Sequence, residues 1–223
     1  MALDRIQKII AQSGLMSRRK AEEAILEHRI AVNGILVTEM GRVVDPSLEI
    51  ITVDGLSLPK ITLKKTYRFY KPKGILTTKF DPEGRSTIMD YFKDEPSLNP
   101  VGRLDAESEG LLLLTHDGDL LLNLTHPRYG VQKVYEVEVE GRGVPHYLEM
   151  LLSGVMLSDG EGQFDDCEVL EVHRSFVVRV SEGRNRFIRR MFGALGFTVT
   201  KLKRIQMGEF KLGELNPGEK ALV

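Results

Sequence analysis

An Arg-Leu-Asp triplet at residues 103–105 opens an acidic, glycine-containing turn that leads into a run of four leucines. A carboxylate there would lie at the edge of a structural element, beside the charge of Arg103. Taken alone, Asp105 is a turn residue or a helix N-cap, because short carboxylates accept hydrogen bonds from nearby backbone amides. Glu107 and Glu109 raise the alternative of a two-carboxylate glycosidase, but the separation that such chemistry needs cannot be read from a sequence. Exposed loop acids are the simpler interpretation of these two glutamates.

Two segments of the chain are strongly basic although the whole chain is nearly neutral. The formal net charge is −1, from 31 Lys plus Arg and 32 Asp plus Glu. Residues 60–80 hold seven bases and no acid, and residues 179–211 hold nine bases with only Glu182 and Glu209 as acids. If the segments share a face, they form an electrostatic footprint for phosphates. The alternative is that each is a solvated face balanced by acidic neighbours in space.

A third group of cations is Arg18, Arg19 and Lys20, which directly follow Ser17. Ser17 is a natural N-cap, so the three cations crowd the first turn of a predicted helix, where the helix dipole is also positive. That arrangement favours a bound phosphate, since helix N-termini and Arg or Lys side chains both receive phosphates. Alternatively, three acids further along the helix offset the cations: Glu22, Glu23 and Glu27.

The composition is that of an ordinary globular protein, with 223 residues, 42% hydrophobic and 28% charged. The single cysteine, Cys167, cannot form an internal disulfide, which indicates a reducing cytoplasm. No stretch approaches the roughly 18 apolar residues of a membrane helix, and charges near the N-terminus argue against a signal peptide. We therefore expect no membrane association and no metal site. Five histidines show no zinc-ligand spacing and are read as structural or surface residues: His28, His116, His126, His146 and His173.

The N-terminal quarter is predicted to form two short helices followed by strands. Residues 3–13 place Leu3, Ile6, Ile9 and Ile10 on one helical stripe, and Gly14 is a typical C-terminal stop. A second helix follows Ser17 and directs Ala21, Ala24 and Ile25 inward. Asn33-Gly34 predicts a type I′ hairpin, and residues 49–55 predict another strand. This α-α-β-β-β unit ends near Pro59, where a basic linker over residues 60–66 begins.

The rest of the chain mixes strands and helices without regular β-α-β alternation. This pattern favours an α+β domain around a mainly antiparallel mixed sheet over a doubly wound parallel one. The predicted strands are 67–72, 74–78, 111–115, 133–139, 176–180 and 198–205. The predicted helices are 87–92, 118–125, 145–152 and 186–195.

The segment RIQKIIAQSGLMSRRKAEEAILEHRIAVNGILVTEMGRVVDPSLEIITVDG resembles the S4-type RNA-binding domain. The resemblance implies a module, over residues 1–60, that docks on folded RNA through its helices and hairpin. Six positions match those that face RNA in such domains: Arg5, Lys8, Ser17, Arg18, Arg19 and Lys20.

Four further segments resemble, in order and spacing, the motifs of pseudouridine synthases, in the branch that holds the ribosomal small-subunit enzyme and its large-subunit relatives. They are YKPKGILTT at 70–78, NPVGRLDAESEGLLLLTHDGDLLLNLTHP at 99–127, KVYEVEVEG at 133–141, and SEGRNRFIRRMFGALG with VTKLKRIQMG at 181–208. The resemblance implies a catalytic domain over residues 65–223. Segments such as YEVEVEG favour the large-subunit branch.

The resemblance also implies a role for particular residues. Asp105 matches the catalytic aspartate, Tyr135 the tyrosine that lies against the target uracil, and Arg189 the arginine that pairs with the aspartate. Leu202 matches the apolar residue of the base pocket, and Phe187 departs from the glutamine of many relatives. Arg103 is expected to bind substrate, and three further arginines to bind RNA: Arg184, Arg186 and Arg190.

The implied reaction breaks the N1–C1′ bond of uridine, rotates the base and joins its C5 to the same sugar carbon. No redox change occurs, so we expect no cofactor. The site needs an ionised carboxylate in a pocket that excludes water, and an adjacent guanidinium would keep it charged. The target base must be flipped out and held by stacking. The expected partner is ribosomal RNA or a pre-ribosomal particle, bound by a cytoplasmic monomer.

Two alternatives from other classes stay open on the sequence. A ribosome-assembly factor would bind ribosomal RNA without chemistry, and the presence of Asp105, Tyr135 and Arg189 counts against it. A nucleoside or glycoside hydrolase would release free uracil or sugar. Formation of a mass-neutral uridine isomer without released base separates the three.

Overall fold

The computed structural model describes residues 3–58, 64–170 and 174–223. The linker expected at 60–66 falls largely outside these residues, as does His173. The chain divides into two units, each with its own core. The units are Met1–Lys64 with Glu95–Ser97, and Lys65–Asp94 with Leu98–Val223.

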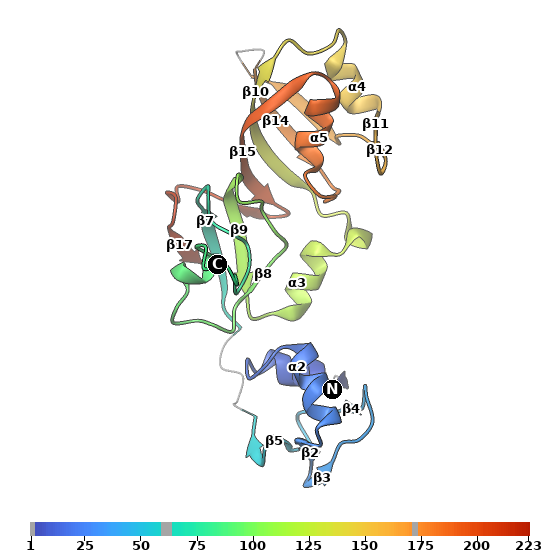
Figure 1. Ribbon diagram of the computed structural model, residues 1–223, viewed down its shortest axis with the longest axis vertical. Coiled ribbons are helices and arrows are strands. Elements are labelled where there is room, and N and C mark those ends of the chain that lie inside the picture. The colour runs from blue at the N-terminus through green and yellow to red at the C-terminus, as the bar shows by residue number, and fades with distance from the viewer. Residues whose placement is uncertain (1–2, 59–63, 171–173) are drawn as a thin grey trace. The chain divides into compact units, whose positions relative to one another are not determined.

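The small unit packs two helices on short antiparallel strands (Figure 1). A four-stranded sheet has the order β3-β2-β5-β6, and β1 pairs with β4. Its core is aliphatic and is built from residues such as Ile6, Ile25 and Val53. The element bounds are β1 Asp4–Arg5, α1 Ile6–Gln12, α2 Arg18–Leu26, β2 Ile30–Val32, β3 Ile35–Leu36, β4 Val43–Val44, β5 Ile51–Val53 and β6 Leu56–Ser57.

Local signals at α2 and at the hairpin are confirmed. The Ser17 hydroxyl accepts a hydrogen bond from the Lys20 amide at 3.3 Å, which caps α2. Asn33 and Gly34 have φ angles of 52° and 81°, as a type I′ turn between β2 and β3 requires. The first helix is shorter than predicted: Asp4–Arg5 are drawn into β1 by pairing with β4, so Leu3 is left exposed.

The large unit is built on a nine-stranded mixed sheet, and the predicted α+β class is confirmed (Figure 1). The strand order is β13-β14-β10-β15-β9-β7-β17, with β16 on β15 and β8 on β9. The nine strands of this sheet are β7 Thr66–Lys71, β8 Asn99–Pro100, β9 Glu109–Thr115, β10 Lys133–Gly141, β13 Asp166–Val169, β14 Ser175–Val180, β15 Phe197–Met207, β16 Phe210–Lys211 and β17 Lys220–Leu222. A separate two-stranded sheet pairs β11 Val155–Leu157 with β12 Gly160–Gly162. The helices of the large unit are α3 Gly118–Thr125, α4 Tyr147–Ser153, α5 Phe187–Ala194 and the 3₁₀ turns η1 Ile88–Tyr91 and η2 Pro127–Tyr129.

Two antiparallel halves of this sheet meet where β9 runs parallel to β15. At that junction Gly110 is paired with Arg204. Gly110 has φ of 100°, and a Cβ at this position would lie 2.3 Å from the Arg204 carbonyl oxygen. Only glycine therefore allows the two strands to approach this closely.

The sheet is covered on both faces, which explains the continuous leucine run of β9. Leu112 and Leu114 belong to one core cluster, and Leu111 and Leu113 belong to the other. Alternate residues of a strand point to opposite faces, so a strand buried on both sides is apolar throughout. The sequence of β9 follows directly from this position in the sheet.

The predicted strand at 74–78 is wrong. These residues form a loop in which Leu76 makes a single bridge to Thr87. The Thr77 hydroxyl donates to the Leu104 carbonyl at 2.7 Å, so the loop holds the segment that leads to Asp105. Across the described ranges, no helix is long and apolar enough to cross a membrane.

Candidate active site

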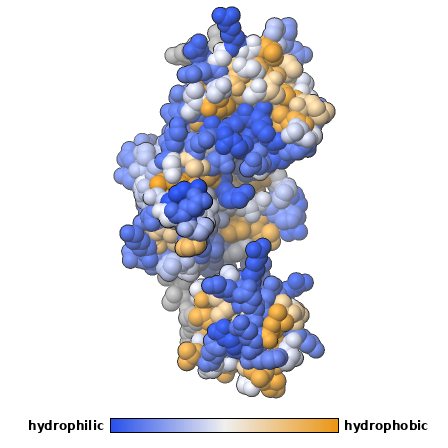
Figure 2. Space-filling model, viewed as in Figure 1, coloured by the Kyte–Doolittle hydropathy of each residue, from blue (hydrophilic) through white to orange (hydrophobic). Residues whose placement is uncertain are grey.

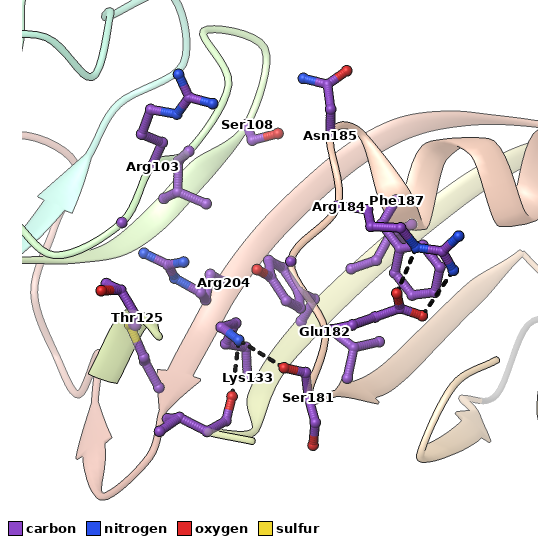
Figure 3. Close-up of a pocket in the computed structure, with 18 of the residues that line it drawn as sticks. Arg103, Ser108, Thr125, Lys133, Ser181, Glu182, Arg184, Asn185, Phe187 and Arg204 are labelled. Carbon is purple, nitrogen blue, oxygen red and sulfur yellow. Dashed lines mark hydrogen bonds and ion pairs between the residues drawn. The ribbon is translucent and has the colours of Figure 1, made fainter. Parts of the chain in front are cut away.

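A pocket of about 760 Å³ lies in the large unit, close to the β9–β15 junction (Figure 3). Four segments far apart in the sequence line it: the loop before β9, the end of α3 with η2, the loop between β14 and α5, and the facing strands β10 and β15. Such a volume is within the roughly 300–1,000 Å³ of small-molecule sites. Six sequence-predicted residues line this pocket: Arg103, Asp105, Tyr135, Arg184, Arg186 and Leu202.

Asp105 lies in the loop between β8 and β9, and its side chain is half-buried at the pocket. The loop is fixed through its backbone: the Ser108 amide donates to the Asp105 carbonyl at 3.0 Å, and the Gly74 amide donates to Ala106 at 2.6 Å. The Asp105 carboxylate makes no hydrogen bond or ion pair with a residue that the structure describes. It therefore caps no turn and is available to a ligand.

Lys71, at the end of β7, is hydrogen-bonded to the loop that carries Asp105. It is 0% exposed, and its Nζ donates to the carbonyls of Ser108 at 2.8 Å and Pro72 at 2.9 Å. Burial lowers the pKa of Lys71 to about 8, although the charges of Asp105 and Glu109 oppose the shift. A buried cation thus fixes the backbone of the loop that carries Asp105.

The ion pair expected between Asp105 and Arg189 is not formed among the described residues, which corrects the expectation from the motif. Arg189 is largely buried, and its Nη1 donates to the Val199 carbonyl at 2.9 Å. Its Nε lies 3.9 Å from the Glu107 carboxylate, and its Nη2 lies 3.4 Å from the Ser108 hydroxyl. Burial lowers the pKa of Arg189, whereas the charges of Glu107 and, to a smaller degree, Asp105 raise it. Arg189 therefore acts on Asp105 through space and holds the loop that carries it.

Tyr135 and Leu202 lie on one face of the sheet, on the neighbouring strands β10 and β15. Tyr135 is paired with Arg204, and Val137 is paired with Leu202. Tyr135 is 8% exposed and Leu202 is 7% exposed, and both line the pocket. An aromatic ring and a branched aliphatic group are thus brought together beside the pocket, as a flat apolar ligand would require.

The arginines before and within α5 are tied to acids. Arg184 contacts Glu182 at 2.6 Å, Arg190 contacts Asp159 at 2.7 Å, and Arg186 contacts Glu107 at 3.0 Å. The Arg186 hydrogen bond and charge hold the pKa of the Glu107 carboxyl below its usual value. Arg189 and Arg190 are not among the residues that line the pocket, whereas Arg184 and Arg186 are. Each of these arginines has a structural partner.

Phe187, the departure from the family pattern, is buried in the core. Its ring packs edge-on against Phe164 with centroids 5.9 Å apart, and the Arg184 guanidinium lies 4.9 Å from its centroid. The side chain offers no hydrogen bond where a glutamine would. It anchors the start of α5 by packing instead, and Arg189 keeps its place on the helix.

The predicted RNA-facing residues of the small unit are mostly exposed. Arg18, Arg19 and Lys20 form no ion pair with a described acid. Arg5 is exposed, whereas Lys8 is partly buried and contacts Asp4 at 2.9 Å. Figure 2 shows hydrophilic side chains projecting from the side of this unit that carries α2, and apolar residues at the end near β3. Among the described residues, none of the three cations forms an ion pair with Glu22, Glu23 or Glu27.

Four pocket or loop residues were missed from the sequence: Lys71, Ser108, Lys133 and Arg204. Lys133 stands two residues before Tyr135, and Arg204 two after Leu202, so strand alternation alone puts each pair on one face. That signal was present in the sequence. Lys71 and Ser108 depend on the pairing of β7 with β9, which no local pattern indicates. His126, read as structural, caps η2 and also lines the pocket.

The geometry suits a reaction on an RNA nucleoside. One pocket brings together the Asp105 carboxylate, which has no partner among the described residues, the Tyr135 ring and several cations. Nowhere in ranges 3–58, 64–170 and 174–223 do three or more His, Cys, Asp or Glu side chains form a group that would hold a metal ion.

Comparison with known proteins gives consistent matches over both units. The model of the RNA pseudouridylate synthase family matches residues 65–194, and that of the S4 domain matches residues 4–50. The ribosomal large subunit pseudouridine synthase B of Bacillus subtilis (strain 168) is 39% identical over 225 residues, covering 97% of this chain and 91% of that protein. An RNA pseudouridine synthase of Aquifex aeolicus (strain VF5) is 40% identical over 220 residues, with 96% and 88% covered.

Solved structures agree with these matches. A pseudouridylate synthase crystal structure superposes with a TM-score of 0.69 at 27% identity, over 98% of this chain and 95% of that one. A chain from an H/ACA ribonucleoprotein bound to a substrate RNA gives a TM-score of 0.50 at 17% identity, over 67% of this chain and 49% of that one. The second match shows a shared fold only.

Proposed function

The chain belongs to the RNA pseudouridylate synthase family, and from this premise we propose that it isomerises specific uridines of ribosomal RNA, with large-subunit RNA favoured over small-subunit RNA. The large-subunit preference is supported by the similarity to the B. subtilis enzyme, whose name states that substrate. One observation carries the assignment of the site: the half-buried Asp105 carboxylate faces a 760 Å³ pocket without a partner among the described residues.

Asp105 is the catalytic carboxylate in this proposal. It either adds to C1′ of the flipped uridine or removes the C2′ proton, and in both routes the N1–C1′ bond breaks and the uracil leaves with the bonding electrons. After the base rotates, C5 forms the new bond to C1′ and the carboxylate is released or returns the proton. The C5 proton is then lost and N1 gains one, so the product is an isomer of the substrate.

Lys71 and Arg189 are positioning residues for Asp105. Lys71 fixes the Ser108 carbonyl at 2.8 Å, and Arg189 reaches Ser108 and Glu107 in the same loop. Both residues therefore fix the loop that carries Asp105 without bonding to its carboxylate. This long-range arrangement replaces a direct ion pair and leaves both carboxylate oxygens free for the sugar.

Tyr135 and Leu202 are proposed to hold the flipped uracil. The buried tyrosine ring supplies the stacking face, and the leucine supplies an apolar contact from the neighbouring strand. Arg103 is exposed at the rim and is proposed to contact the RNA around the extruded nucleotide. Flipping is required because an atom inside a base-paired stem cannot reach Asp105.

The two parts of the chain are proposed to divide the work. Residues 1–60 dock on folded RNA through Arg5, Lys8 and the residues 17–20, and residues 65–223 carry out the isomerisation. The unpaired cations at the start of α2 support the docking role. We further propose that the protein acts as a cytoplasmic monomer, without a cofactor, on ribosomal RNA or a pre-ribosomal particle.

The test is to incubate the purified protein with unmodified ribosomal RNA transcripts and analyse the digested nucleosides. The proposal expects pseudouridine at a defined position, in large-subunit rather than small-subunit RNA, with no free uracil. Released uracil would indicate a hydrolase, and bound but unchanged RNA would indicate an assembly factor. Either result would contradict the proposal.

A further inference from the structure

Two cations in the pocket, Lys133 and Arg204, have no assigned role in the isomerisation and no carboxylate partner within 4 Å among the described residues. Lys133 Nζ donates to the carbonyls of Val131 at 2.8 Å and Ser181 at 3.1 Å, as the dashed lines in Figure 3 show. Main-chain carbonyls fix the position of an ammonium group but leave its charge unneutralised. The pocket therefore contains positive charge that no contacting acid balances.

Arg204 is more deeply buried than Lys133. The residue is 2% exposed, and its Nε donates to the Leu111 carbonyl at 2.8 Å. Its Nη2 atom is buried and has no hydrogen-bond partner within the described part of the chain. Buried donors without partners are rare and costly, so such an atom calls for an explanation. In Figure 3 the Arg204 guanidinium lies among the side chains of Arg103, Thr125 and Lys133, which also line the pocket.

Strand pairing brings the two cations next to the proposed uracil platform. Arg204 on β15 is directly opposite Tyr135 on β10, and Lys133 lies two residues before Tyr135 on the same face. Burial lowers the pKa of Lys133, and the charge of Arg204 lowers it further. The two charges are thus close enough to repel one another. A bound anion would relieve that repulsion.

The neighbouring charged residues already have partners of their own. Arg184 and Arg186 are already paired with Glu182 and Glu107. Asp165 is the acid whose charge acts on Lys133, and its carboxylate accepts a hydrogen bond from the Ser181 hydroxyl at 2.7 Å.

We propose that Lys133 and Arg204 form a phosphate subsite, which binds a phosphate group attached to the flipped uridine. Two uncompensated cations in a partly desolvated pocket require an anion, and the phosphodiester is the anion that a uridine in RNA brings with it. The free nitrogens of an arginine fork suit phosphate oxygens. The inference rests on the proposed function and extends it, since the site would grip the sugar-phosphate backbone beside the base.

The experiment compares the binding of uridine, uridine 5′-monophosphate and uridine 3′-monophosphate by ligand-observed NMR. The wild-type protein is expected to bind one of the two nucleotides about tenfold more tightly than uridine. That preference should fall to about threefold or less in Lys133→Gln and in Arg204→Gln, and persist in part in Arg204→Lys. The two nucleotides distinguish which phosphate is bound. Lys201→Gln is the matched control, because Lys201 is on β15 but pairs with Glu138 at 3.2 Å outside the pocket.

Equal wild-type affinity for all three ligands would overturn the subsite, and so would an unchanged preference in both Lys133→Gln and Arg204→Gln. Circular dichroism melting identifies a variant that does not fold, in which case the milder variants decide. Pseudouridine formation by the wild-type protein on ribosomal RNA is measured in parallel. If pseudouridine forms while the nucleotide preference is absent, only the subsite fails; if none forms, the proposed function itself fails.

Discussion

The cations at the start of α2 and those around the pocket of the large unit have opposite surroundings. Arg18, Arg19 and Lys20 are exposed and have no described acidic partner. Around the pocket, Arg184 and Arg190 are paired with acids, and Lys71 is buried against carbonyls. In our proposal the first group exchanges counterions for RNA phosphates, whereas the second group mainly builds the site. A run of basic residues therefore does not by itself identify a binding surface.

The largest effect on stability is expected at Gly110, where β9 approaches β15 beside the pocket. A Gly110→Val substitution should lower the free energy of unfolding by about 3 kcal/mol or more, because the side chain would meet the Arg204 backbone and φ is 100°. Gly84→Ala is the control: its φ is also positive, at 72°, but nothing lies within 4 Å of the new Cβ, so about 1–2 kcal/mol is expected. Denaturant unfolding measures both, and equal losses would contradict the close approach of β9 and β15.

On the exposed side, replacing Arg18, Arg19 and Lys20 together by Gln should weaken binding to ribosomal RNA about 10- to 100-fold. The slope of log affinity against log salt should decrease in magnitude by about 2 to 3, since each cation is expected to release about one counterion. Turnover at saturating RNA and the melting temperature should stay unchanged. A variant that binds RNA as the wild type does would make these cations a solvated face after all.

Burial of Lys71 is expected to make the stability of the protein depend on pH, which is not expected of the exposed cations of α2. Its pKa is lowered to about 8 in the folded protein from an ordinary 10.5, mainly by burial. Between these values the unfolded chain binds more protons than the folded one, so this residue makes stability rise with pH. The free energy of unfolding of the wild type, minus that of Lys71→Met, should therefore increase as the pH is raised from 8 to 10.5. A constant difference between the two proteins would show that Lys71 is not buried as a cation.

The smallest effects are expected at the paired arginines. Arg184→Gln or Arg190→Gln should lower the free energy of unfolding by roughly 0.5–1 kcal/mol, since each removes partly exposed ion pairs. RNA affinity should change by less than about twofold if their acids already satisfy them. A tenfold loss of RNA affinity with unchanged stability would instead show that these arginines bind RNA. Thermal melts and filter binding on the same preparations distinguish the outcomes.

Local sequence signals predicted the elements that depend on local chemistry. The Ser17 cap, the Asn33-Gly34 turn and the buried strand β9 all follow from neighbouring residues. The predicted strand at 74–78 is wrong because Thr77 bonds to the backbone at Leu104, a partner that is distant in the chain. The helix predicted from residue 3 starts later for the same reason, since β4 captures residues 4 and 5.

The site shows the same division. Motif resemblance named Asp105, Tyr135 and Leu202, and all three line one pocket. The predicted ion pair between Asp105 and Arg189 is not formed, because the Arg189 guanidinium instead contacts the Glu107 carboxylate and the Val199 carbonyl. Lys71 could not be placed from the sequence, because its role depends on where β7 lies relative to the loop before β9.

The most direct test of the central claim is the turnover of Asp105→Asn on its ribosomal RNA substrate, measured as pseudouridine formed per enzyme. The substitution keeps the size of the side chain and removes its negative charge. We predict a fall of roughly 10³-fold or more, with RNA affinity and melting temperature within error of the wild type. Turnover equal to that of the wild-type protein would remove Asp105 from the chemistry and contradict the proposed mechanism.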